Sequence, residues 1–304
     1  MRPANYSFTR YLAAKKDLDD RSLNRGVWEA LARAVQERRD PAPLRVLEVG
    51  CGIGTMLERL LAWGLWGQAA YTAIDLDPAN LAEARRRLGG LAGAAAPAGE
   101  TGPLLITDRS REVRVELETI DLFEFIQRER GRASWDLLIA HAFLDLMDLP
   151  AILPPLFSLL RPGGLFYFTL NFDGATIFEP ALDPDLDRRI EVCYHDTMDQ
   201  RRLHGRPTGG SRTGRRLFQH LVAAGARVVA AGSSDWVVFP GPEGYPGDEA
   251  YFLHFIIDTM DRALEGLPGL EPSALKAWVE VRHRQIEAGR LIYLAHQLDF
   301  FGYI

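Results

Sequence analysis

Residues 47–55 read LEVGCGIGT and place three glycines, Gly50, Gly52 and Gly54, at every second position. The run before them is apolar and the run after them has helical spacing, so the stretch predicts a tight turn from a strand into a helix. Glycine lacks a side chain and adopts left-handed conformations, so a ligand can approach the backbone of such a turn closely. A phosphate, the amino-acid end of a ligand and no ligand at all remain open at this point.

The chain around this turn alternates short apolar runs with helical patterns. Continuous apolar strands alternating with helices predict a parallel sheet covered on both faces. The expected strands are Arg45–Val49, Tyr71–Asp75, Val113–Thr119, Trp135–Ala140, Leu165–Asn171 and Arg227–Gly232, and the tail RLIYLAHQLDFFGYI is expected to add one more. The expected helices are Met56–Leu65, Ala79–Leu88, Leu122–Arg130, Pro155–Leu160 and Thr213–Ala224.

Other segments do not follow the alternation. Residues 1–40 have helical spacing, and we expect them to form an N-terminal helical lid in front of a catalytic domain that spans 41–304. Gly89–Asp108 is rich in Ala, Gly and Pro, and is expected to be a loop insertion. Residues 174–210 and 240–289 are too long for simple loops and are expected to form cap insertions.

Composition excludes several classes of protein. The 304 residues carry 35 Lys and Arg against 41 Asp and Glu, a net charge of −6, which argues against a nucleic-acid partner. The two cysteines, Cys51 and Cys193, cannot form a disulfide framework, and no Cys/His spacing predicts a metal site. No signal segment or long apolar run is found, so we expect a cytoplasmic protein with no membrane partner.

Acidic residues follow the ends of three predicted strands. Glu48 lies just before the glycine turn, Asp75 ends the second strand, and Asp121 follows the third. A carboxylate beside the turn suits a cationic ligand end better than a pyrophosphate. A dinucleotide fingerprint also requires a glycine where this chain has Thr55. Carboxylates at the carboxyl edge of such a sheet are typical of nucleoside sites, although each alone is also a common strand end or helix cap.

These motifs resemble, in order and spacing, those of class I S-adenosylmethionine-dependent methyltransferases. The resemblance rests on VLEVGCGIGT, AIDLDP, the Asp121-Leu122 pair, WDLLIAHAFLDLMD and LLRPGGLFYFTL. It implies a doubly wound, seven-stranded Rossmann-like α/β sheet, with six parallel strands and one antiparallel C-terminal strand. It also implies S-adenosyl-L-methionine as cofactor and S-adenosyl-L-homocysteine as product. By motif, the cofactor would be bound by Glu48, Gly50, Gly52, Gly54, Asp75, Leu76, Asp121, Leu122, Ala140 and His141.

The acceptor side of the site is less defined by the sequence. His141 ends the fourth strand and is the candidate general base, with cofactor contact as the alternative role. Tyr11, His195 and Arg212 are the candidate substrate-binding residues. Arg212 belongs to a cluster that also contains Arg201, Arg202, Arg206, Arg215 and Arg216, which suits an anionic acceptor or is simply a solvated surface. Five aromatic residues are further candidates for the pocket wall: Trp236, Phe239, Tyr245, Tyr251 and Phe252.

We therefore expect a methyltransferase that modifies an oxygen or nitrogen atom of a small, possibly charged molecule, as a monomer or homodimer. The fourth strand ends in AHAF, not in the Asn/Asp-Pro-Pro-aromatic motif common in the family's nucleic-acid branches. A protein methyltransferase, a non-catalytic module that binds an adenosyl ligand, and an NAD-dependent oxidoreductase remain alternatives.

Overall fold

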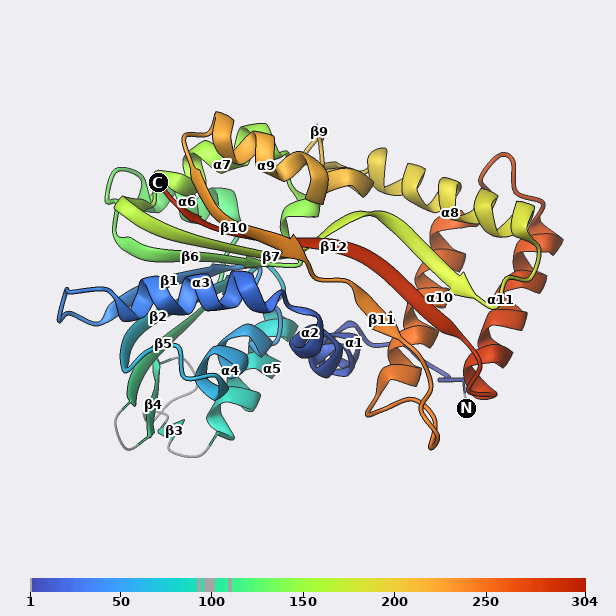
Figure 1. Ribbon diagram of the computed structural model, residues 1–304, viewed down its shortest axis with the longest axis horizontal. Helices are drawn as coiled ribbons and strands as arrows, with labels where there is room; N and C mark the ends of the chain where they lie inside the picture. The colour runs from blue at the N-terminus through green and yellow to red at the C-terminus, as the bar shows by residue number, and fades with distance from the viewer. Residues whose placement is uncertain (1, 92–93, 96–101, 109–110) are drawn as a thin grey trace.

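The structure is a computed structural model, and it describes residues 2–91, 94–95, 102–108 and 111–304. A mixed sheet forms the centre of the molecule, with helices on both faces and a helical cap at one end (Figure 1). Its strands follow the order β10-β12-β7-β6-β1-β2-β5-β4-β3, and β11 pairs with β12. The strand bounds are β1 Leu44–Val49, β2 Gln68–Asp75, β3 Ala94–Ala95, β4 Leu104–Asp108, β5 Arg111–Thr119, β6 Trp135–His141, β7 Leu160–Glu179, β10 Arg227–Ser233, β11 Trp236–Val238 and β12 Ile292–Tyr303.

The seven central strands have the expected arrangement. β5, β2, β1, β6 and β7 are mutually parallel, and β12 lies antiparallel between β7 and β10. The glycine turn connects β1 at the middle of this sheet to the next helix. The predicted class I arrangement, with one antiparallel C-terminal strand, is therefore confirmed.

Two apolar layers cover the faces of the sheet. One face buries Val27 and Leu31 together with side chains from the helices after β1 and β2, and the other buries residues such as Phe125, Leu153 and Leu217. The first layer consists of α3 Arg25–Gln36, α4 Thr55–Ala62 and α5 Pro78–Gly89. The second consists of α6 Leu122–Glu129, α7 Leu149–Phe157 and α9 Thr213–Ala223.

β7 and β12 continue beyond the central sheet into the cap (Figure 1). A third apolar cluster joins these extensions to the cap helices and to the first helices of the chain. The elements of this region are α1 Phe8–Ala14, α2 Lys16–Ser22, α8 Pro184–Asp199, α10 Glu249–Leu264 and α11 Pro272–Glu287. Between α8 and α9 lie a short hairpin, β8 Arg202–Leu203 and β9 Arg206–Pro207, and the turn η2 Gly210–Arg212. A similar turn, η1 Leu144–Leu146, follows β6.

Two local expectations are wrong. The expected loop Gly89–Asp108 contains β4, which pairs antiparallel with β5 because Leu104 and Ile106 bury their side chains there, while 92–93 and 96–101 lie outside the described residues. The expected helix Pro155–Leu160 is α7, which begins six residues earlier, at Leu149. Pro150 occupies the first turn of α7. A backbone N–H at this position would have no partner within the helix, so proline costs no hydrogen bond there.

Candidate functional site

A cavity of about 560 Å³ lies at the carboxyl ends of β1, β2, β5 and β6. Its size is within the range of about 300–1,000 Å³ that is usual for ligand pockets. The glycine turn and the strand ends form one part of its wall. The remainder comes from α1, the hairpin β8–β9 and Trp236, which are far from the turn in sequence. The topology therefore combines a sheet-edge site with a cover made of several separate segments.

The glycine turn has the backbone geometry that its composition predicts. Gly50, Gly52 and Gly54 have φ values of +65°, +53° and +79°, in the left-handed region. A Cβ on Gly50 would lie 2.2 Å from Cδ2 of Phe143, so any other residue would require the Phe143 ring or the turn to move. Gly50 and Gly52 line the cavity, whereas a Cβ on Gly54 would instead face Ala84 and Leu88 of α5. Gly54 thus permits close packing of helices rather than contact with the cavity.

Glu48 lines the cavity although its side chain is almost fully buried. Its Oε2 accepts a hydrogen bond of 2.6 Å from the hydroxyl of Tyr71. Burial raises the pKa of Glu48 to about 8, against the hydrogen bond from Tyr71 and the charge of Arg59. A cationic group entering the cavity would favour ionisation of this carboxyl, so the site suits a positively charged ligand end.

Asp75 connects the end of β2 to the glycine turn. Its Oδ2 accepts from the backbone N–H of Gly52 at 2.8 Å, and its Oδ1 accepts from the N–H of Asp77 at 2.9 Å and from Asn80 at 3.2 Å. Leu76, the next residue, is exposed along the cavity wall. The Oδ1 of Asn80 is buried and has no hydrogen-bond partner among the described residues. This free acceptor in the cavity wall is available to a ligand donor such as a hydroxyl.

Asp121 serves first as the N-cap of α6. Its Oδ1 accepts from the N–H groups of Phe123 and Glu124 at 2.8 and 3.3 Å. Its Oδ2 lies 3.8 Å from Nε2 of His204 on the hairpin, across the cavity wall. Leu122 also lines the cavity. Asp121 is therefore the N-cap of α6 and also lines the cavity.

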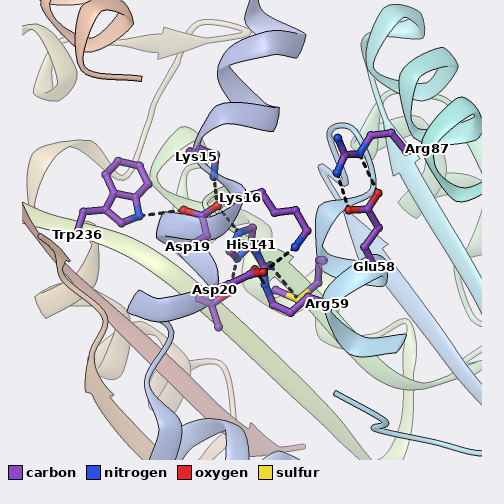
Figure 2. Close-up of polar contacts among 11 residues, drawn as sticks. Lys15, Lys16, Asp19, Asp20, Glu58, Arg59, Arg87, His141 and Trp236 are labelled. Carbon is purple, nitrogen blue, oxygen red and sulfur yellow. Dashed lines mark hydrogen bonds and ion pairs between the residues drawn. The ribbon is translucent and has the colours of Figure 1, made fainter. Parts of the chain in front are cut away.

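His141 belongs to a buried polar cluster with the N-terminal helices (Figure 2). Its Nε2 lies 3.2 Å from Oδ2 of Asp19, and its Nδ1 lies 2.8 Å from the hydroxyl of Thr169. Asp19 also binds Lys15 at 2.5 Å and accepts from the indole N–H of Trp236 at 2.9 Å. Although burial opposes ionisation, the charge of Lys15 and the hydrogen bond with His141 lower the pKa of Asp19 below its ordinary value. The cluster thus joins residues 15, 19, 141, 169 and 236.

This arrangement does not leave His141 free to act as a base. Since Asp19 is ionised, it accepts a hydrogen bond from the Nε2–H group of His141. The lone pair of Nδ1 then accepts a hydrogen bond from the hydroxyl of Thr169, so both ring nitrogens are occupied. Burial lowers the pKa of His141 to about 4. The expected catalytic role is therefore not supported by the geometry, while a cofactor contact remains a prediction because His141 lines the cavity. Ala140 is fully buried and is not among the residues that line the cavity.

A second ion-pair group attaches α2 to the helix that follows the glycine turn (Figure 2). The fully buried Arg59 of α4 donates from Nε to Oδ1 of Asp20 at 2.5 Å, and Lys16 pairs with the other oxygen of Asp20 at 2.6 Å. On the far side of α4, Glu58 binds Arg87 of α5 through two hydrogen bonds. Ion pairs therefore attach α2 to α4, and α4 to α5, beside the glycine turn.

The three candidate substrate-binding residues are separated by the structure. Tyr11 lines the cavity, whereas His195 and Arg212 do not. His195 lies on α8 with its Nε2 3.0 Å from the hydroxyl of Thr176, and Arg212 lies on η2. Both residues lie on cap elements whose position cannot be inferred from local pattern. The structure does not place them at this cavity, and their role in substrate binding stays a prediction. Among the five candidate aromatic residues, only Trp236 lines it.

Several residues of the cavity wall were not singled out as substrate-binding residues, although Arg201 and Arg202 belong to the arginine cluster of the sequence. Phe143 packs over Gly50, and the hairpin contributes Arg201, Arg202, His204 and Thr208. Asp19, which orders His141, gives no signal in the sequence because it resembles any charged residue on a surface helix. The sequence shows the arginine cluster, but only the structure shows which of its members line the cavity.

The wall of the cavity fits S-adenosylmethionine. A side-chain-free cradle at Gly50 and Gly52 admits a ligand to the backbone, and the unpartnered Oδ1 of Asn80 can accept from it. Glu48 matches a cationic amino group, and Asp75 and Asp121 match hydroxyl and amino donors. These are the residues of this chain that would bind the cofactor.

Comparison with known proteins identifies a methyltransferase domain in part of the chain. A family model described as a methyltransferase domain matches residues 47–166. A segment of 51 residues is 49% identical to the trans-aconitate 2-methyltransferase of Methylobacterium nodulans. That segment covers 17% of this chain and 19% of the relative, so the chain matches about a fifth of the relative's length.

Solved structures of methyltransferases and a related synthase are similar at a low level. A SAM-dependent methyltransferase from Archaeoglobus fulgidus is 14% identical, with 92% of this chain and 95% of that chain covered and a TM-score of 0.40. A mycolic acid cyclopropane synthase in complex with SAH and CTAB is 10% identical, with 99% and 100% covered and a TM-score of 0.44. The assignment of the fold therefore rests on the strand order.

Over the described residues, no helix is long and apolar enough to cross a membrane. The glycine turn opens the segment matched by the family model, and the sheet built around that segment has the class I strand order. Residues 47–166 thus match a methyltransferase domain, and they lie within a sheet that has the class I strand order.

Proposed function

We propose that the protein transfers a methyl group from S-adenosylmethionine to an oxygen or nitrogen atom of a small molecule. The observation that carries this proposal is the single cavity whose wall includes both the glycine turn and the cover made by α1, the hairpin β8–β9 and Trp236. A site enclosed in this way suits an acceptor that can be surrounded, because methyl transfer requires alignment of two substrates and exclusion of water.

The cavity divides into two halves. We define the donor half by Glu48, Gly50, Gly52, Asp75 and Asp121, all from the sheet edge. The acceptor half is defined by Tyr11, Lys15, Arg201, Thr208 and Trp236. When bound in the donor half, S-adenosylmethionine supplies a methyl group activated by a sulfonium. The residues of the chain bind and orient both substrates.

Lys15 and Trp236 are ordered by their shared partner Asp19, and this cluster also positions His141 between the halves. Because both nitrogens of His141 are occupied, we propose that His141 orients substrate and does not itself act as the base of the step. The name of the trans-aconitate 2-methyltransferase is in accord with a small acceptor, and its short match leaves this a proposal for the present chain.

The test is methyl transfer from isotopically labelled S-adenosylmethionine to a cell extract separated into small-molecule and protein fractions. We expect label in the small-molecule fraction, and none with a variant Gly50→Ala that blocks the donor half. Label only in the protein fraction would support a protein methyltransferase instead. S-adenosylhomocysteine binding without any transfer in either fraction would support the non-catalytic module.

A further inference from the structure

The arginine cluster between residues 201 and 216 is divided by the structure into members with different surroundings. Arg201 and Arg202 line the large cavity, and Arg206 lines a separate small hollow. Arg215 is bound to Asp173 through its Nε at 2.9 Å, while Arg216 is exposed on α9 and lies outside the cavity wall. Only the first two members are therefore placed to meet a ligand there.

Arg201 lies between the end of α8 and the start of the hairpin. Its carbonyl accepts from the N–H of Thr208 at 3.3 Å, which fixes these two residues opposite each other across the hairpin. Arg201 is exposed, lines the cavity and makes no ion pair with any residue that the structure describes. Burial raises the pKa of the neighbouring Asp145 against the charge of Arg201, so Asp145 is a poor counter-ion.

Thr208 provides a second, independent feature at the same place. It lines the cavity, and its hydroxyl is buried with no hydrogen-bond partner in the described part of the chain. A buried hydroxyl without a partner is unfavourable, and a ligand oxygen that accepts its proton would satisfy it. A guanidinium and a hydroxyl on facing positions together offer donors to both oxygens of one carboxylate.

Charge is distributed unevenly around the cavity. The acidic lining residues, Glu48, Asp75, Asp77 and Asp121, all belong to the sheet edge. The cationic side chains come from the opposite cover, where Lys15 is neutralised by Asp19, whereas Arg201 and Arg202 have no ion pair within the described part of the chain. The acidic side suits a cationic donor, and the hairpin side suits an anionic acceptor.

We propose that the methyl acceptor is an organic carboxylate, bound through a carboxylate group by the guanidinium of Arg201 and the hydroxyl of Thr208. This assignment rests on the proposed function and specifies the class of its substrate. The walls beside these donors are mostly apolar, including Tyr11, Phe143, Leu146 and Met147, and they suit the carbon skeleton of a small acid rather than a polar sugar.

The experiment uses the full chain loaded with S-adenosylhomocysteine and titrated by calorimetry with succinate, citrate and benzoate. The matched neutral probes are succinamide and benzamide, and glycerol phosphate tests a phosphate ligand. We expect at least one acid to bind at least tenfold more tightly than its amide. The acids that bind are then offered to the enzyme with labelled S-adenosylmethionine, and the KM for the acid is compared among variants.

Arg201→Gln should weaken binding of the acid by about tenfold or more and raise its KM, with Arg201→Lys restoring part of the loss. Thr208→Val should have a smaller effect in the same direction. Arg216→Gln, from the same cluster but outside the cavity, should behave as the wild type. Affinity for S-adenosylhomocysteine should stay unchanged in all of them, which also shows that the variants are folded.

Equal binding of acids and amides, preference for glycerol phosphate, or an unchanged KM in Arg201→Gln would overturn the carboxylate assignment. If the wild type bound none of the acids while binding S-adenosylhomocysteine, the assignment would also fail and the proposed function would stand. Failure to bind S-adenosylhomocysteine at all would instead refute the proposed function.

Discussion

The donor half and the acceptor half of the cavity are built in different ways. The donor half depends on backbone geometry: three glycines with positive φ, and a carboxylate at Asp75 that binds the N–H of Gly52. The acceptor half depends on side chains from α1, α2, the hairpin and β11, which meet through long-range contacts. Contiguous motifs thus form one half, and tertiary packing assembles the other.

The largest effect is expected from Gly50→Ala, which should break the donor half alone. The new Cβ would lie 2.2 Å from Cδ2 of Phe143, so either the turn or Phe143 must move into the space for the ligand. We expect the affinity for S-adenosylhomocysteine, measured by calorimetry, to fall at least a hundredfold, or about 3 kcal/mol.

Gly131→Ala is the matched control, because Gly131 also has a positive φ, of +80°, but nothing lies within 4 Å of its Cβ position. This variant should lose about 1–2 kcal/mol of stability from backbone strain and retain its ligand affinity. Similar losses of affinity in both variants would mean that strain, and not the close approach, explains the first result.

Asp19→Asn should break the acceptor half. Asp19 is fully buried between Lys15, His141 and Trp236, and its loss leaves a buried ammonium without a counter-ion. Removing one partner of a buried pair costs about 3–5 kcal/mol, and we expect the free energy of unfolding in urea to fall by about 3 kcal/mol. Asp17→Asn, at an exposed position of the same helix, should change it by less than about 0.5 kcal/mol. A small effect at position 19 would show that the cluster does not hold the acceptor half together.

Glu48 gives the donor half a characteristic pH dependence. Its carboxyl keeps a proton up to a pKa of about 8 in the folded protein, whereas it ionises near 4.5 in the unfolded chain. Between these values the unfolded state binds fewer protons, so the free energy of unfolding should fall as the pH rises from 4.5 to 8. Below pH 4.5 the carboxyl is protonated in both states and the contribution is fully present.

Glu48→Gln isolates this effect, since the amide does not titrate. The difference in unfolding free energy between wild type and variant should decline from pH 5 to pH 8 in urea titrations. A difference that stays constant over this range would contradict a raised pKa for Glu48.

The smallest effect concerns Asp121, whose cap role can be separated from its place at the cavity. Asp121→Ala removes the acceptor for two N–H groups at the start of α6 and should lower the free energy of unfolding by about 1 kcal/mol. Asp121→Asn keeps a good cap and should be close to the wild type in urea. Equal stability of all three proteins would show that the cap contributes little.

The same contrast explains what the sequence could predict. Residues 47–55, Asp75 and Asp121 lie at strand ends whose positions follow from hydrophobic pattern, so the donor half and the seven central strands were predictable. Gly54 was predicted by motif to bind the cofactor. The sequence pattern does not show that a Cβ at this position would face α5.

Most residues of the acceptor half could not be predicted from the sequence. His195 and Arg212 were chosen for residue type, and both lie outside the cavity because their positions depend on how the cap packs. Arg201 and Arg212 belong to the same arginine cluster in the sequence, and only the structure shows that Arg201 lines the cavity and Arg212 does not. The role of His141 likewise depends on Asp19, which is 122 residues away in sequence.

The central claim is that the glycine turn and the acidic strand ends bind an adenosyl ligand with a cationic end. Calorimetric titration of the wild-type protein with S-adenosylhomocysteine and with NAD tests it most directly. We predict micromolar or tighter binding of S-adenosylhomocysteine, lost in Gly50→Ala, and no binding of NAD. Binding of NAD without binding of S-adenosylhomocysteine would contradict the account.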